Sequence, residues 1–197
     1  MIRRLEQAFA AQLAHPDTCL QAHAHPDFHV HDPPPPREKG TGRAPCCVLT
    51  TGRRNEADLY VRNPNRRTVH LVVIDHCLYD DSHPSKCDCA LVSDDKVYFV
   101  EFKTQEISAG ATAPNSYPNP GDCLPQLAAS IRDFYDRGII EPQQTVHAYA
   151  SVGYPRKGPQ HGAHHQDQLR ALQVRIQEDK PRPIRLRYCS ESELDIA

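Results

Sequence analysis

Apolar residues recur along this chain at two spacings, and each spacing predicts a different kind of element. Near-helical spacing over residues 2–14 predicts a helix with one buried stripe, because residues three to four apart share a helix face. Alternating or unbroken apolar runs of four to eight residues predict strands. The stripe consists of Ile2, Leu5, Phe9 and Leu13, and the strand-like runs are CCVLT (46–50), DLYV (58–61), TVHLVVID (68–75), 87–92, 97–102, 145–152 and 184–189.

Turn residues between these runs predict two antiparallel hairpins. The tripeptide NPN at 63–65 separates DLYV from TVHLVVID, and SDDK at 93–96 separates the runs 87–92 and 97–102. Asn, Pro, Ser and Asp favour tight turns because they preset the backbone or bond to it locally. We therefore expect the members of each pair to be neighbouring strands.

Two helices are predicted in the second half of the chain. Asp122 is placed to cap the first, and Gly138 stands where a helix end is commonly closed. The second is a polar helix over 166–180. Their inward stripes are Leu127, Ile131 and Phe134, and then Leu169, Leu172 and Ile176. This order of elements indicates an α/β or α+β domain with a mixed sheet flanked by helices.

Residues 16–45 differ in composition from the rest of the chain. They contain four histidines, four successive prolines and a Gly-rich stretch. Successive prolines exclude a helix or a central strand, so this segment is expected to be an extended surface connection. We accordingly expect one domain over residues 1–197, with a core at 46–153 and a C-terminal extension at 154–197.

The bulk numbers fit an ordinary globular protein. The chain has 197 residues, 39% of them hydrophobic and 24% charged, with a net charge of -2. That balance lacks the basic footprint of non-specific nucleic-acid binding proteins, so any polyanion site must be local. No apolar run reaches the length needed to cross a bilayer, and no membrane partner is expected.

The eight cysteines and twelve histidines are candidates for disulfide bonds or metal binding. The chain begins with an amphipathic pattern and not an apolar signal segment, which favours a reducing, cytoplasmic setting over a disulfide framework. No CxxC pair is present, so the cysteines are expected to be small buried core residues and not zinc ligands. The tract HAHPDFHVHD is expected to be a solvated loop, as are His161, His164 and His165.

Charged residues interrupt the hairpin CDCALVSDDKVYFVEFK, where buried strands normally carry none. Because side chains alternate across a strand, Glu101 and Lys103 share one face. If Asp88 on the partner strand faces the same way, two carboxylates and an ammonium group converge at one end of the sheet. Buried charges need partners, and a pair of carboxylates suits a hard divalent cation such as Mg²⁺ or Mn²⁺.

This pattern resembles the motif of the PD-(D/E)xK nuclease superfamily, which has the restriction-endonuclease-like fold. In that motif an Asp is followed by a strand, a turn and then Glu-x-Lys. The resemblance covers roughly 69–152, with the first helix as an extra core element, and it implies a core of helix, three strands, helix and strand. By position, Asp88 is the first motif acid, Glu101 the second and Lys103 the motif lysine. The proline of the first motif is absent, because Cys87 precedes the acid.

The resemblance also implies supporting roles for residues outside the motif. Glu6 matches an acid from the first helix, Gln126 matches a polar residue on the helix after the motif, and the main-chain carbonyl of Phe102 would complete the metal ligands. These residues would bind one or two Mg²⁺ ions for phosphodiester hydrolysis, with Lys103 positioning the attacking water. Contacts to the nucleic-acid backbone would come from Arg62, Arg66 and Arg67, or from Arg182, Arg185 and Arg187.

Three functions follow from this interpretation. The first is a metal-dependent nuclease, a phosphodiester hydrolase acting on DNA in a defence, repair or mobile-element system, with a homodimer or a protein partner supplying specificity. The second is a non-catalytic nuclease-like module that binds a protein partner in an assembly or immunity role. The third is an RNA-directed hydrolase on the same scaffold. Endonuclease and exonuclease modes both stay open.

Overall fold

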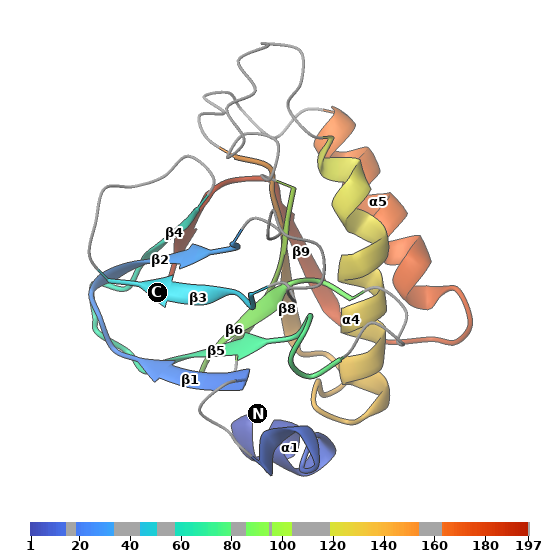
Figure 1. Cartoon of the computed structure of the whole chain (residues 1–197). Helices are drawn as coiled ribbons and strands as arrows, with labels where there is room; N and C mark the ends of the chain where they lie inside the picture. The colour runs from blue at the N-terminus through green and yellow to red at the C-terminus, as the bar shows by residue number, and fades with distance from the viewer. Residues whose placement is uncertain are drawn as a thin grey trace, which may run out of the picture.

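A computed structural model describes residues 1–14, 19–33, 44–50, 58–79, 86–94, 96–103, 119–153 and 163–196. Within these ranges the protein is a mixed α/β fold with two mixed sheets and three α-helices (Figure 1). No helix among these residues has both the length and the apolar character needed to span a membrane. The described part of the chain therefore consists of two sheets and the helices that cover one of them.

The central layer is a six-stranded sheet in the order β1-β5-β6-β7-β8-β9. Its first four strands run antiparallel, whereas β8 is parallel to β7 and β9 is parallel to β8. A parallel neighbour requires a crossover, and α4 lies in the connection between β7 and β8. The strands are β1 (Leu20–His23), β5 (Val69–Val73), β6 (Cys89–Ser93), β7 (Lys96–Phe102), β8 (Thr145–Ser151) and β9 (Arg185–Cys189).

A second, four-stranded sheet lies against one face of the first. Its order is β10-β4-β2-β3, with β10 parallel to β4 and the other pairs antiparallel. Leu59 and Val61 of β4 and Phe28 of β2 are buried between the two sheets. The strands are β2 (Asp27–His31), β3 (Cys47–Leu49), β4 (Leu59–Arg62) and β10 (Glu193–Asp195).

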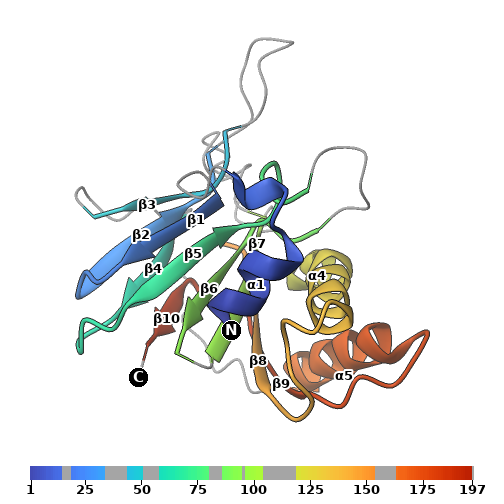
Figure 2. The ribbon, with the colours of Figure 1, turned by 90° about the horizontal axis from the view of Figure 1, so that it is seen from below.

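The helices cover the other face of the six-stranded sheet, so that β7 is buried on both sides (Figures 1 and 2). Val97 and Phe99 of β7 pack toward the helices, whereas Tyr98 and Val100 pack toward the second sheet. This alternation follows from the two-residue period of a strand. The helical segments are α1 (Ile2–Ala8), a 3-10 turn at Gln12–Ala14, a 3-10 turn at Pro120–Cys123, α4 (Leu124–Asp136) and α5 (Ala163–Gln177).

The hairpin expected over 87–102 is confirmed as β6 and β7, and the helix expected after it is confirmed as α4. Gly138 has a φ of 71° just after α4, which confirms it as the residue that closes the helix. The start differs from the prediction: the side chain of Asn119, and not that of Asp122, caps the turn that leads into α4. The strands at 145–152 and 184–189 and the polar helix near 166–180 are confirmed as β8, β9 and α5.

The predicted helix over 2–14 is interrupted at Phe9, whose φ and ψ are -121° and 32°. Its apolar stripe is nevertheless buried as expected. The ring of Phe9 lies 5.6 Å from that of Tyr79 and 5.8 Å from that of Phe134, measured between centroids. The N-terminal segment thus docks on the end of α4 and on the chain that follows β5.

The hairpin expected between DLYV and TVHLVVID is wrong. The NPN turn exists, but β4 belongs to the second sheet and β5 to the first. The buried amide of Asn63 explains the divergence, because its Nδ2 donates to the carbonyls of His25 (3.0 Å) and Arg67 (2.8 Å). These bonds hold a corner between the two sheets, and a local turn signal does not distinguish such a corner from a hairpin.

The extended connection expected over 16–45 is also wrong in part, because β1 and β2 lie within it. The tract HAHPDFHVHD is built into both sheets and is not a solvated loop. Phe28 and Val30 are buried in β2, and His31 Nδ1 lies 2.7 Å from Asp58 Oδ1. The prolines at 34–36 lie outside the described residues.

Cys19 and Cys77 form a disulfide with a Cα–Cα distance of 5.6 Å. The expectation that the cysteines are all reduced is therefore wrong for this pair. Of the other six, Cys46, Cys87, Cys89 and Cys123 are buried free thiols, as the sequence predicts. The bond ties the start of β1 to the segment that follows β5.

Candidate functional site

Glu101 and Lys103 lie at the end of β7 on its helix-covered side. Alternation along the strand places Glu101 on the same face as Val97 and Phe99. Its carboxylate is only 4% exposed, and Lys103 Nζ donates to its Oε1 over 2.7 Å. The structure therefore brings these two side chains together as the alternation predicts.

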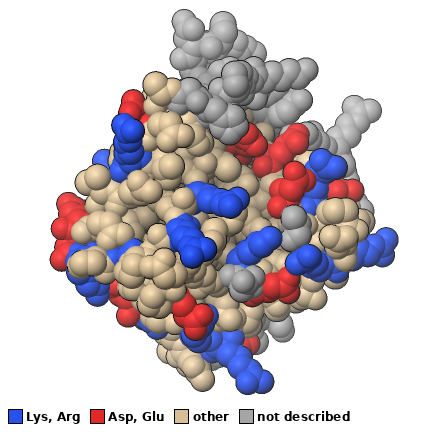
Figure 3. Space-filling model, turned by 180° about the vertical axis from the view of Figure 1, so that it is seen from behind, with Lys and Arg blue, Asp and Glu red and all other residues tan. Residues whose placement is uncertain are grey.

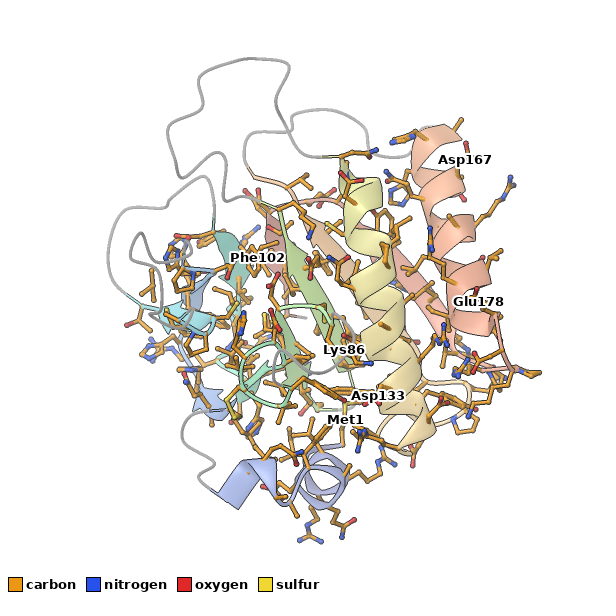
Figure 4. All side chains as sticks on the ribbon, turned by 45° about the vertical axis from the view of Figure 1, so that its right-hand side comes forward. Met1, Lys86, Phe102, Asp133, Asp167 and Glu178 are labelled. Atoms are coloured by element: carbon orange, nitrogen blue, oxygen red, sulfur yellow. A yellow bond between two sulfur atoms is a disulfide. The ribbon has the colours of Figure 1, made fainter. Side chains whose placement is uncertain are left out.

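Asp88 comes immediately before β6 and is anchored to the end of β7. Its Oδ2 accepts a hydrogen bond from the main-chain amide of Phe102 over 2.6 Å, and the residue is 6% exposed. Figure 4 labels Phe102 on β7 and Lys86, which is two residues before the acid and points toward α4. Asp88 is near enough to Glu101 for its charge to act on that carboxyl group. The two acids thus meet at one end of the sheet.

A third acid, Asp75, belongs to the same neighbourhood and was not identified from the sequence. Its amide and that of Ile74 donate to the carbonyl of Asp88, over 3.2 Å and 3.0 Å. Its charge also raises the pKa of Glu101. The available signal was an Asp at the end of the apolar run TVHLVVID, which sheet pairing brings beside β6.

The electrostatics of the site centre on Glu101. Burial, and then the negative charge of Asp88, raise the pKa of its carboxyl group well above 4.5, and the ammonium group of Lys103 only partly offsets this. Burial by itself would lower the pKa of Lys103, but the adjacent Glu101 raises it. A second positive charge at this position would lower the pKa of Glu101 toward its usual value.

The start of α4 closes the site from the helix side. With its amide oriented to satisfy both neighbours, Gln126 accepts a hydrogen bond from Lys103 Nζ over 3.0 Å and donates to the carbonyl of Asp122 over 3.0 Å. The structure thus places Gln126 beside Lys103, where the sequence resemblance expected a polar residue. Buried Cys123 lies beside the carbonyl of Glu101, with its Sγ 3.8 Å from that oxygen.

The donor set fits a hard divalent cation in one specific respect. Glu101 Oε2 is a buried oxygen with no hydrogen-bond partner, which is costly unless a ligand supplies one. Asp88 and Glu101 would hold the ion, leaving its remaining positions for water or substrate oxygens. Among the described residues no three His, Cys, Asp or Glu side chains form a ready-made metal cluster. The carbonyl of Phe102 stays a predicted ligand.

Glu6 does not join this group. It is exposed on α1, and its charge acts on His70 of β5. His70 pairs with Val92, which is near the opposite end of β6 from Asp88. The acid expected from the first helix is therefore wrong, and the further acid whose charge acts on Glu101 is Asp75.

Arg62 and Arg67, two of the arginines expected to contact a nucleic-acid backbone, lie away from Asp88 and Glu101. The role of Arg62, Arg66 and Arg67 in binding stays a prediction. Arg67 pairs with Asp94 over 2.8 Å, in the turn that joins β6 to β7. That turn is separated from Glu101 by most of β7, about 17 Å at 3.3 Å per residue. Arg62 Nε lies 3.6 Å from Asp195 Oδ1 and forms an ion pair with it. At least two of these arginines thus already have carboxylate partners.

The C-terminal arginines divide into two kinds. Arg182 is 1% exposed and forms ion pairs with Asp136 and Asp179, each at 2.7 Å, so its role is structural and not a surface contact to nucleic acid. Arg185 and Arg187 are exposed on β9. His164 and His165 lie in α5, and His161 lies outside the described residues.

No protein-family model matches this chain, and neither a curated protein nor a solved structure does.

Proposed function

We propose that the protein is a metal-dependent nuclease that hydrolyses phosphodiester bonds, most simply in DNA. The observation that carries this proposal is the pairing of Asp88 with buried Glu101, whose Oε2 lacks a partner, beside Lys103. An orphaned carboxylate oxygen among negative charges destabilises the fold unless a cation binds there. Such a cost is typical of a site kept for function.

The order of elements supports the same proposal. From β5 onward the elements β5, β6, β7, α4 and β8 come in the order of three strands, helix and strand, with the last strand parallel to β7. α1 precedes them as the helix, although β1, β2, β3 and β4 lie between α1 and β5. This is the order that the PD-(D/E)xK nuclease resemblance implies. Membership of that superfamily, and the restriction-endonuclease-like topology, are part of this proposal.

Each side chain would have a defined task in the reaction. Asp88 and Glu101 would hold Mg²⁺ or Mn²⁺, which supplies Lewis-acid polarisation of the phosphate and a more acidic water. Lys103, held by Glu101 and Gln126, would position the attacking water and offset the negative charge that develops on the phosphate. Gln126 would act as a positioning residue, because it contacts Lys103 and not the phosphate.

The test is cleavage of supercoiled and linear DNA, single-stranded DNA and RNA in Mg²⁺, Mn²⁺ or EDTA. We expect cleavage with metal and none in EDTA. Lys103→Ala should lower the rate by about 10²–10³-fold, and Glu101→Gln should abolish it. Glu178→Gln, at the residue that follows α5, is the matched control because its side chain is 69% exposed, and it should cleave as the wild type does.

A second function is favoured by one observation: both acids already have a bonding partner inside the protein, the amide of Phe102 and the ammonium of Lys103. In a non-catalytic module that binds a protein partner, these bonds alone would account for the motif. If the wild-type protein cuts none of the substrates with Mg²⁺ or Mn²⁺, the nuclease proposal is refuted and the non-catalytic binding module is favoured. Cleavage of RNA alone would instead favour the RNA-directed hydrolase.

A further inference from the structure

A basic pocket lies far from the carboxylates, at the other end of the parallel strands. It has a volume of about 400 Å³ and includes cationic or polar side chains from β7, β8 and β9. Figure 3 shows the face that is turned away in Figure 1, over which Lys and Arg side chains are distributed together with Asp and Glu side chains. The residues that define this pocket chemically are Lys96, Gln143, Thr145, His147, Arg185 and Arg187.

Strand alternation separates this pocket from the candidate active site by face as well as by length. Lys96 alternates with Val97 in β7, so it shares the face of Tyr98 and not that of Glu101. Arg187 pairs in register with His147, and His147 with Tyr98. The pocket therefore opens on the face opposite the helices, about 17 Å along β7 from Glu101.

Two of the cations in the pocket, Arg185 and Arg187, have exposed side chains on β9. Within the described ranges neither Arg185 nor Arg187 forms an ion pair with a carboxylate, although the chain as a whole carries a net charge of -2. Burial, and then Arg187 and Lys96, lower the pKa of His147 to about 4, so its ring is neutral at pH 7. A neutral ring beside two cations indicates a local positive potential.

The donors in this pocket match one class of ligand. Two guanidinium groups, an ammonium group, two amides and a hydroxyl can all donate hydrogen bonds, and the lining includes no Asp or Glu. A phosphate group presents acceptor oxygens and negative charge, and Arg binds it through two parallel bonds. Arg185 and Arg187 are two residues apart on one strand, about 6.6 Å, which allows them to contact neighbouring phosphates of one strand.

We propose that the pocket of Lys96, His147, Arg185 and Arg187 binds backbone phosphates of a nucleic-acid strand, at a place separate from the site of cleavage. The choice of nucleic acid as the ligand rests on the proposed function. The location of the binding site does not rest on the proposed function, because it follows from the pocket and from Arg185 and Arg187, which have no carboxylate partner within the described ranges. Of the two arginine sets that the sequence offers for backbone contacts, this pocket contains Arg185 and Arg187 of the second set, and it adds Lys96 and His147.

The test measures binding without cleavage. Fluorescein-labelled single-stranded and duplex oligonucleotides are titrated with protein in EDTA, by fluorescence anisotropy, across a series of salt concentrations. Arg185→Ala/Arg187→Ala is compared with Arg170→Ala/Arg175→Ala on the exposed face of α5, which removes the same charge from the helix side. Circular dichroism verifies that both variants stay folded.

We expect the β9 double variant to bind at least about 10-fold more weakly and to reduce the slope of log K against log salt by about 2, one for each lost phosphate contact. The α5 double variant should bind as the wild type does. An equal loss in both variants, or no loss in the β9 variant, would overturn the proposal.

Two competitors distinguish other sources of negative charge. Displacement of the oligonucleotide by millimolar inorganic phosphate, with saturable phosphate binding that the β9 variant loses, would assign the pocket to a small phosphate ligand instead. Tight binding of poly-glutamate that depends on Arg185 and Arg187 would assign it to an acidic protein segment. Binding is measured in EDTA and therefore does not depend on cleavage. If the protein binds through this pocket in EDTA but does not cleave when metal is added, only the proposed catalysis is refuted.

Discussion

The carboxylate of Asp88 accepts a hydrogen bond from the main-chain amide of Phe102 over 2.6 Å, which joins the residue before β6 to the last residue of β7. Both residues are buried, so loss of this acceptor leaves an amide without a partner. The first motif acid therefore has a structural role whether or not it binds a metal.

Replacing Asp88 should separate these two roles. Asp88→Ala should lower the free energy of unfolding by about 2 kcal/mol, because it orphans the buried amide of Phe102. Asp88→Asn retains an acceptor oxygen and should lower that free energy less, while still weakening metal binding. Urea denaturation in EDTA measures both values. Equal stability of the Ala variant and the wild type would contradict the structural role.

Glu101→Gln should make the protein more stable at neutral pH. Burial and Asp88 raise the pKa of Glu101 above 4.5, so the folded state holds this proton more tightly than the unfolded chain. The contribution of Glu101 to stability is therefore fully present below pH 4.5 and falls as pH rises toward the folded-state pKa. Thermal melts of wild type and variant in EDTA should diverge above about pH 5. A variant that melts lower at pH 7 would contradict this electrostatic account.

Divalent cations should reverse that difference. A cation that binds only the folded wild type stabilises it by about 1.4 kcal/mol at ten times its Kd. Adding Mg²⁺ or Mn²⁺ should raise the melting temperature of the wild type but not that of Glu101→Gln, because the variant lacks the buried carboxylate. Glu178→Gln should respond as the wild type does. This measurement tests the metal site without requiring any substrate.

Reduction of the Cys19–Cys77 bond should lower stability. The bond spans 58 residues, and the chain-entropy model gives about 4 kcal/mol for a loop of that length. Cys19→Ser/Cys77→Ser should melt at a lower temperature than the oxidised wild type and match the reduced wild type. Thiol titration of denatured, unreduced protein should find six free thiols of the eight cysteines. A count of eight would contradict the bond.

Arg182→Ala should destabilise the protein without altering any cleavage of the folded fraction. The guanidinium group is almost fully buried and donates to Asp136, Asp179 and the carbonyl of Ile176. Removing it should cost about 2 kcal/mol, since hydrogen bonds to charged groups and to a buried carbonyl are lost. Equilibrium urea unfolding provides the value. Arg170→Ala, whose side chain is 76% exposed, is the control and should lie near the wild type.

Local patterns were enough to predict the part of the site that lies within one hairpin. Glu101 and Lys103 share a face because strands alternate, and the SDDK turn places the strand preceded by Asp88 beside β7. α4 could be located because its apolar stripe and Gly138 act over short sequence distances. These inferences depend on backbone geometry that any strand or helix of this sequence would adopt.

The tertiary structure decided which distant segments meet. Asp75 reaches Glu101 only because β5 pairs with β6, and Cys19 reaches Cys77 only because β1 pairs with β5. Asn63 turns the chain from one sheet to the other, so β4 leaves β5 although a turn joins them. Hydrophobic periodicity predicts which residues of a strand are buried. Because β7 has a hydrophobic core on each of its two faces, the periodicity does not predict which distant residues join each core. Tertiary packing determines that.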